Sequence, residues 1–181
     1  MRTIFLILII FFIFAQKHAY TEHKIIKKIS EIENFTFDFE QLINDKKETG
    51  NCIISFNNKM MCKYDETGKL IVSNGKTLLI KNKSSNFANT YKTENTYFKY
   101  FLNKEFLISK ISGNVVEKEQ NFLLSINDQN NQLKIFFDKN NYFIKGWETT
   151  DLYGNKVRSN IIVKNINQEF SDSIFNLNLY N

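Results

Sequence analysis

Residues 24–41 read KIIKKISEIENFTFDFEQ, and the spacing of their apolar side chains changes once within this stretch. The first half carries isoleucines three and four residues apart, as on one face of an α-helix: Ile25, Ile29 and Ile32. Thr21 is suited to cap such a helix, so we predict a helix over residues 21–33. The second half alternates phenylalanine with polar residues over Phe35–Glu40, which is the period of a β-strand with one apolar face.

The rest of the chain is typical of antiparallel strands interrupted by one helical segment. Before the interruption, strand-like runs flank Asn57-Asn58 and the hairpin signal Asn74-Gly75: Cys52–Phe56, Met60–Tyr64, Lys69–Ser73 and Thr77–Lys81. Residues 94–111 favour one or two amphipathic helices. Strands resume at Phe122–Ile126, Leu133–Asp138, Tyr142–Thr150 and Val157–Ile166. We therefore predict an α+β fold in which one mostly antiparallel sheet is covered on one face by helices.

Residues 1–15 have the pattern of a secretory signal peptide. One arginine precedes an unbroken apolar run over Ile4–Phe14, and Ala15 is a small residue suited to a cleavage site. The run is shorter than the roughly 20 apolar residues that a spanning helix needs. We expect cleavage after Ala15, or as far on as Ala19, to leave one mature domain over residues 16–181. The alternative is an uncleaved N-terminal anchor.

The charged residues do not indicate a nucleic-acid partner. The chain has 24 Lys and Arg against 19 Asp and Glu, and its only arginines are Arg2 and Arg158. A nucleic-acid groove clusters its positive charge and favours arginine, whereas these lysines are scattered among asparagines. Nucleic acid is therefore excluded from the expected partners.

The titratable residues argue against catalysis. His18 and His23 are the only histidines, and they lack the further ligands that a metal site needs. A cysteine nucleophile needs a base beside it, and no histidine lies in the domain body. The glycines are isolated, so no phosphate-binding loop is present. We predict no catalytic residue, no metal site and no cofactor, and hence a binding protein rather than an enzyme.

Cys52 and Cys62 are the two cysteines of the chain. They occupy even positions in two neighbouring predicted strands, so a suitable register places them opposite each other on one face. Because an exported protein meets an oxidising compartment, they form either a disulfide or two buried thiols.

Phenylalanine is abundant, with 18 in the chain. The simplest interpretation is an ordinary filled core. The alternative is a curved sheet under a helical cover that leaves an apolar cavity for acyl chains. The candidate lining residues of that cavity come from the two helical segments and the first strand: Ile25, Ile29, Ile32, Phe37, Phe39, Phe98, Phe101, Leu102 and Phe106.

Four stretches together resemble the periplasmic outer-membrane lipoprotein carrier protein family, LolA. Phe35–Gln41 is similar to the family's opening strand, and Ser73–Leu78 matches its hairpin almost letter for letter. Asn95–Phe98 opens the central helical segment much as the family does. The late hairpin, last long strand and closing phenylalanine are matched by Gly146–Glu148, Asp151–Asn155, Asn160–Asn165 and Ile174-Phe175.

The resemblance implies an incompletely closed antiparallel β-barrel with a helical lid over an apolar cavity. It implies a monomeric periplasmic carrier that shields the acyl chains of lipoproteins. The implied partners are acylated lipoproteins, an inner-membrane lipoprotein-releasing ABC transporter and an outer-membrane acceptor. The same fold also serves lipid- or lipoprotein-binding sensors and structural modules that do not shuttle cargo, and this is the alternative function.

One position departs from the family pattern. The family commonly has an Arg-Pro pair in which the arginine tethers the lid, whereas this chain has Asn57-Asn58-Lys59. Neither Asn58 nor Lys59 reproduces a guanidinium fork. The expected lid latch is therefore weaker, or is made by Lys59.

Overall fold

The computed structural model describes residues 19–56, 58–83, 87–128, 131–151 and 153–180. The predicted signal peptide and His18 lie outside these residues.

A first helix includes residues 19–30 and therefore ends three residues before the predicted boundary. The strands are β1 (Asn34–Ile43), β2 (Lys46–Ser55), β3 (Lys59–Tyr64), β4 (Leu70–Asn74), β5 (Thr77–Lys81), β6 (Ala88–Lys92), β7 (Val115–Glu117), β8 (Phe122–Asp128), β9 (Asn131–Phe137), β10 (Ile144–Thr150) and β11 (Lys156–Ile166). The other helices are η1 (Thr93–Asn95), α2 (Phe98–Leu102), α3 (Lys104–Ile111), η2 (Asp172–Phe175) and η3 (Leu177–Leu179).

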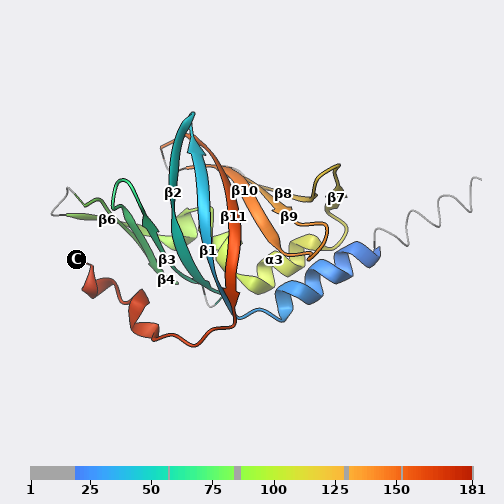
Figure 1. Ribbon diagram of the computed structural model, residues 1–181, viewed down its shortest axis with the longest axis horizontal. Helices are drawn as coiled ribbons and strands as arrows, with labels where there is room; N and C mark the ends of the chain where they lie inside the picture. Colours follow the sequence, from blue (N-terminus) through green and yellow to red (C-terminus); the bar gives the residue numbers. More distant parts are fainter. Residues whose placement is uncertain (1–18, 57, 84–86, 129–130, 152, 181) are drawn as a thin grey trace, which may run out of the picture.

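The described strands form one antiparallel sheet of 11 strands in the order β6-β5-β4-β3-β2-β1-β11-β10-β9-β8-β7. β1 lies at the centre, between β2 and β11, and so joins the two halves of the chain. The sheet curls strongly but β6 and β7 remain its two edges, so the barrel does not close (Figure 1). The predicted fold class, an incompletely closed antiparallel barrel with a helical lid, is confirmed.

The alternation in β1 decides which face of the sheet becomes the interior. Phe35, Phe37 and Phe39 are buried, while Asp38 and Glu40 are exposed on the opposite face. The pattern then changes at Gln41, whose polar side chain is also buried on the inner face. β1 therefore contributes three aromatic rings and one amide to the barrel interior.

Two glycines allow the strands to approach closely where the sheet bends. A Cβ on Gly50 would collide with the carbonyl of Lys63 and the ring of Phe39. A Cβ on Gly146 would collide with the carbonyl of Ser159. Glycine within a strand often marks such a close approach.

The first helix and the α2–α3 segment pack against the inner face of the sheet. The isoleucines predicted to form the apolar stripe of the first helix are fully buried in the main core: Ile25, Ile29 and Ile32. The carboxylate of Glu22 accepts hydrogen bonds from the backbone N–H groups of Gly113 and Val115, at 3.0 and 3.2 Å. These bonds fasten the first helix to the loop between α3 and β7.

The C-terminal segment crosses the outer face of β3 and β4 (Figure 1). Phe175 is buried there against Met61 and Val72 in a second, smaller core. Lys59 pairs with Asp172 at 2.6 Å and helps to hold η2 against the sheet. The C-terminal segment is thus an apolar cover for the outside of the barrel.

Most of the predicted strands are confirmed, and three differences have a common cause. β6 and β7 were not predicted, and β2 begins at Lys46 rather than Cys52. The first four residues of β2, Lys46–Thr49, are polar and pair with the C-terminal end of β1. They therefore lack the apolar residues by which a strand is recognised in sequence. Edge strands and strand ends lack the apolar alternation on which sequence-based prediction depends.

No helix among the described residues is long and apolar enough to cross a membrane.

Candidate functional site: an apolar groove beneath α2

An aromatic cluster fills the space between the inner face of the sheet and α2. Trp147 of β10 lies between Phe37 of β1 and Phe101 of α2, with ring centroids 6.1 and 4.8 Å away. Phe35 stacks next to Phe37 at 5.4 Å. The rings of sheet and helix therefore interlock, and α2 is held over the barrel mainly by apolar contact.

Two connected hollows run through this cluster. An inner cavity of about 20 Å³ is bounded by strands β1 to β4, by Trp147 of β10 and by the start of α2. A groove of about 100 Å³ continues from it towards the β10–β11 turn. The two hollows share the side chains Gln41, Tyr64, Ile71, Tyr97 and Phe98. Ligand pockets of known proteins span roughly 300–1,000 Å³, so the cover is closed in this conformation.

A larger hollow, of about 570 Å³, lies on the outer face of the sheet and has a different character. Its lining includes Lys134, Glu148 and Arg158, whose charges pair at 3.5 and 3.6 Å. Charged groups on the outer face of the sheet remain solvated, and they offer no site for an acyl chain. The smaller groove beneath α2 is the better candidate because it is apolar and lies in the barrel interior.

The predicted site residues divide into two groups. Four of them line the inner cavity: Phe37, Phe39, Phe98 and Phe101. The others lie outside both hollows but in the same core or against it: Ile25, Ile29, Ile32, Leu102 and Phe106. Phe106 packs on Tyr100, with the ring centroids 5.1 Å apart. The first helix thus contributes to the filled part of the interior in this conformation.

The predicted latch residues bond to the C-terminal segment and to β4 rather than to α2 or α3. Lys59 pairs with Asp172 of the C-terminal segment, as described above. Asn58 adopts a left-handed backbone conformation with φ of 63°, and its carbonyl accepts a hydrogen bond from Ser73 Oγ at 3.1 Å. Both residues therefore support the β2–β3 turn and the outer face of the sheet.

A different lysine joins the cover to the rest of the fold. Lys104, the first residue of α3, pairs with Glu33 at 2.7 Å, and its ammonium group lies 5.7 Å from the ring centroid of Phe56. The pair links α3 to the segment just before β1. No sequence signal marks this contact, because the two residues are 71 positions apart.

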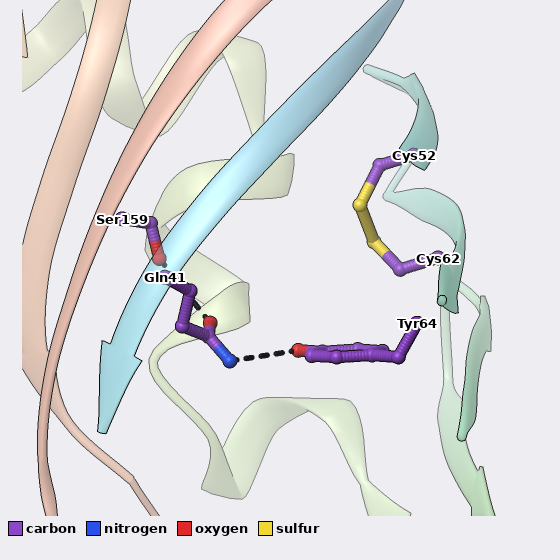
Figure 2. The surroundings of a disulfide bond; sticks show 5 residues. All are labelled: Gln41, Cys52, Cys62, Tyr64 and Ser159. Carbon is purple, nitrogen blue, oxygen red and sulfur yellow. Dashed lines mark hydrogen bonds between the residues drawn. A yellow bond between two sulfur atoms is a disulfide. The ribbon is translucent and has the colours of Figure 1, made fainter. Parts of the chain in front are cut away.

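Cys52 and Cys62 face each other in the register of β2 and β3, with Cα atoms 4.1 Å apart, and a disulfide joins them. Both cysteines line the inner cavity. Figure 2 shows the disulfide on the same side of β2 and β3 as the Tyr64 ring. The bridge therefore stiffens the wall of the cavity rather than the outside of the barrel.

A buried polar cluster lies where the inner cavity meets the groove. Gln41 donates from Nε2 to the Tyr64 hydroxyl at 3.2 Å and accepts at Oε1 from Ser159 Oγ at 3.2 Å (Figure 2). The buried carboxylate of Glu48 pairs with Lys69 at 2.8 Å, and Lys69 also lies 3.8 Å from the Tyr64 ring centroid. Sequence reasoning missed this cluster, because its members come from β1, β2, β3 and β11 and from the turn before β4.

Burial changes the acidity of two tyrosines in this region. Desolvation raises the pKa of Tyr64 to about 12; the hydrogen bond from Gln41 opposes the rise and the charge of Glu48 adds to it. Desolvation also raises the pKa of Tyr97 well above its usual value. Both hydroxyl groups therefore keep their protons at neutral pH.

Among the described residues, no three His, Cys, Asp or Glu side chains gather as metal ligands.

The model of the family described as "Outer membrane lipoprotein carrier protein LolA" matches residues 30–178. The chain belongs to the LolA family. The match begins at the end of the first helix and ends within η3. A comparison with curated protein sequences found no match.

Solved structures share the LolA fold at low sequence identity. An outer membrane lipoprotein-sorting protein domain from Vibrio parahaemolyticus is 10% identical, with a TM-score of 0.52 over 90% of this chain and 98% of that one. A conserved protein from Thermus thermophilus is 7% identical, with a TM-score of 0.51 over 85% and 91% of the two chains. A LolA superfamily protein from Nitrosomonas europaea is 9% identical, with a TM-score of 0.42 over 84% and 96%.

The first two structures, with TM-scores above 0.5, support the fold alone, whereas the family match extends over most of the chain. LolA is a family of carrier proteins, and its fold is one that binds lipids or lipoproteins. The groove beneath α2 is a mostly apolar surface in the interior of that fold.

Proposed function

We propose that this protein is a periplasmic carrier that binds the acyl chains of lipoproteins released from the inner membrane and delivers them to the outer membrane. The observation that carries this proposal is the apolar inner cavity beneath α2, which is walled by aromatic rings from both sheet and helix and adjoins the groove. Family membership supports the same assignment. The partners of such a carrier are an inner-membrane releasing transporter and an outer-membrane acceptor.

Loading requires α2 to move, because the two hollows are too small for an acyl chain. Displacing α2 uncovers its four buried side chains, Phe98, Tyr100, Phe101 and Leu102. At about 1.5–3 kcal/mol for each exposed side chain, opening costs roughly 6–12 kcal/mol. Burying the methylenes of one 16-carbon chain contributes about 12 kcal/mol at about 0.8 kcal/mol each. A single long chain therefore offsets the opening, whereas a short chain does not.

Release needs an acceptor that binds the acyl chains at least as well as the groove does. The free energy that opening costs is recovered on release, because closing α2 restores the contacts of Phe101 with Trp147. The closed conformation thus favours dissociation once a competing apolar site is available. This is the property expected of a carrier rather than of a permanent store.

Binding is measured through Trp147, which is the only tryptophan of the chain and lines the cavity. A diacylated lipopeptide should change its emission, while the same peptide without acyl chains should not. Equal responses to the two peptides, or none to either, would reject acyl-chain binding.

Transport is tested by adding the purified protein to spheroplasts that retain newly made lipoprotein. Release of lipoprotein into the medium as a complex with the protein supports the carrier. Tight acyl binding without release or transfer favours a lipid-sensing or structural module of the same fold.

A further inference from the structure

The apolar cavity contains a hydrogen-bond donor that meets no acceptor in normal geometry among the described residues. Trp147 is 7% exposed, and its indole Nε1 is buried without a hydrogen-bond partner among the described residues. The N–H approaches the Tyr97 hydroxyl but forms no hydrogen bond of normal geometry with it. Buried polar groups in proteins are nearly always paired, so an exception at a ligand cavity indicates a group that the ligand satisfies.

A second donor faces the same cavity. The amide of Gln41 is oriented by its bond from Ser159, so that its Nε2 donates to the Tyr64 hydroxyl oxygen. Tyr64 is therefore the acceptor in that bond and retains its own proton for donation. Within the described part of the chain, the hydrogen bonds of Tyr64 provide no acceptor for this proton.

The charges nearby favour a neutral acceptor over an anion. Glu48 already places a carboxylate 3.4 Å from Gln41 Nε2, and Lys69 neutralises it at 2.8 Å. A second carboxylate would meet the repulsion of Glu48, whose two ammonium partners among the described residues, Lys69 and the more exposed Lys46 at 3.8 Å, are already paired with it. The complementary ligand group accepts hydrogen bonds, donates none and carries no charge.

We propose that the cavity recognises the carbonyl oxygen of an acyl ester or amide through the Trp147 N–H and the Tyr64 O–H. This inference rests on the proposed acyl-chain carrier and adds a chemical criterion to it. Fatty acyl groups have such a carbonyl where the chain meets its head group, whereas alkyl ethers of equal length do not. The protein thus selects acylated ligands over merely apolar ones.

The test compares two lysolipids that differ only in the carbonyl, both below their micelle concentrations. One is 1-palmitoyl-lysophosphatidylcholine, and the other is its 1-O-hexadecyl ether analogue. Two hydrogen bonds to buried donors predict that the wild-type protein binds the ester about tenfold more tightly. Titration calorimetry measures both affinities, and Trp147 emission provides a second measurement.

Two variants assign the preference to the proposed donors. Tyr64→Phe and Trp147→Phe should each lower the ratio of ester affinity to ether affinity, because each removes a donor to the carbonyl, and this ratio cancels any change in binding of the apolar chain itself. Tyr142→Phe is the matched control, because Tyr142 stacks on Phe122 at 5.9 Å and does not line the cavity. Thermal unfolding checks that each variant is folded. If Trp147→Phe proves to be unfolded, the result for Tyr64→Phe alone decides the test.

The outcomes separate this inference from the proposed function. Equal affinities for ester and ether in the wild-type protein, or a preference that Tyr64→Phe retains, overturn carbonyl recognition while leaving acyl binding intact. Binding of neither lysolipid overturns the carrier itself. Tighter binding of palmitate than of the ester shows that the site takes a fatty-acid carboxylate, and this also overturns the proposal for a neutral carbonyl.

Discussion

Replacing Phe101 by asparagine tests whether the interior beneath α2 is a binding cavity or only a core. Phe101 is 2% exposed and packs on Trp147 at a ring-centroid distance of 4.8 Å. Removing a buried phenylalanine costs about 3–5 kcal/mol of folding free energy. For a chain of this size the loss lowers the Tm by roughly 6–20 °C, which a native stability of about 5–15 kcal/mol tolerates in most of that range.

The same substitution places an amide where an acyl chain must lie. Covering an unpaired amide with an apolar chain costs about 1–3 kcal/mol, so affinity for a fluorescent fatty acid or lipopeptide should fall about 5- to 100-fold. Differential scanning calorimetry and a binding titration are performed on the same preparations. Stability and binding are then compared for each variant.

Phe175 supplies the matched control. It is also 2% exposed, but it lies in the second core on the outer face of the sheet. Phe175→Asn should therefore lose a similar amount of stability and bind the ligand as the wild-type protein does. The reasoning is refuted if the two variants lose binding to the same extent, or if Phe101→Asn binds normally.

Three further predictions concern the disulfide, the N-terminus and Tyr64. Oxidised protein should resist thiol alkylation until it is reduced. Reduction should lower stability by about 2–3 kcal/mol, because the unfolded chain gains entropy. Two freely titrating thiols in denatured, unreduced protein would contradict the bridge between Cys52 and Cys62. The mature protein should be recovered in the periplasmic fraction with an N-terminus at or near Gln16; an intact N-terminus in the membrane pellet would show that the leader is not removed. Because the folded-state pKa of Tyr64 is raised to about 12 from an ordinary value of 10.0, its contribution to stability is present below pH 10 and lost as the pH rises towards 12. The loss amounts to about 3 kcal/mol in full and about 2 kcal/mol between pH 9 and pH 11.5. Urea unfolding at these two pH values should therefore show a larger decrease for the wild-type protein than for Tyr64→Phe; equal decreases would mean that Tyr64 is not desolvated.

The elements that were predicted well are those whose side chains alternate between an apolar and a polar environment. Phe35, Phe37 and Phe39 identify β1 and its inner face, and Ile25, Ile29 and Ile32 identify the buried side of the first helix. These patterns are local, because each follows from the geometry of a single helix or strand. β6 and β7 lack the pattern, because edge strands bury few side chains. They are identified only by their hydrogen-bonded pairing with β5 and β8.

The candidate site could be predicted only in its apolar part. Phe37, Phe39, Phe98 and Phe101 were expected at the cavity and line it. Nothing in the sequence distinguished them from Leu102 or the isoleucines of the first helix, which are equally apolar but lie in the filled core. Whether an apolar side chain packs against a neighbour or lines a cavity depends on how the sheet curves. That curvature cannot be predicted from the composition of the chain.

The sequence by itself determined the period of each element, the apolar face of each and the family to which the chain belongs, because these depend on residue order over short distances. Only the tertiary structure decided the partners of single polar groups. Lys59 meets Asp172 rather than the cover, and Gln41 meets Tyr64 and Ser159. Such contacts join residues as many as 118 positions apart, and they are set by the packing of whole strands and helices rather than by any local preference of the residues involved.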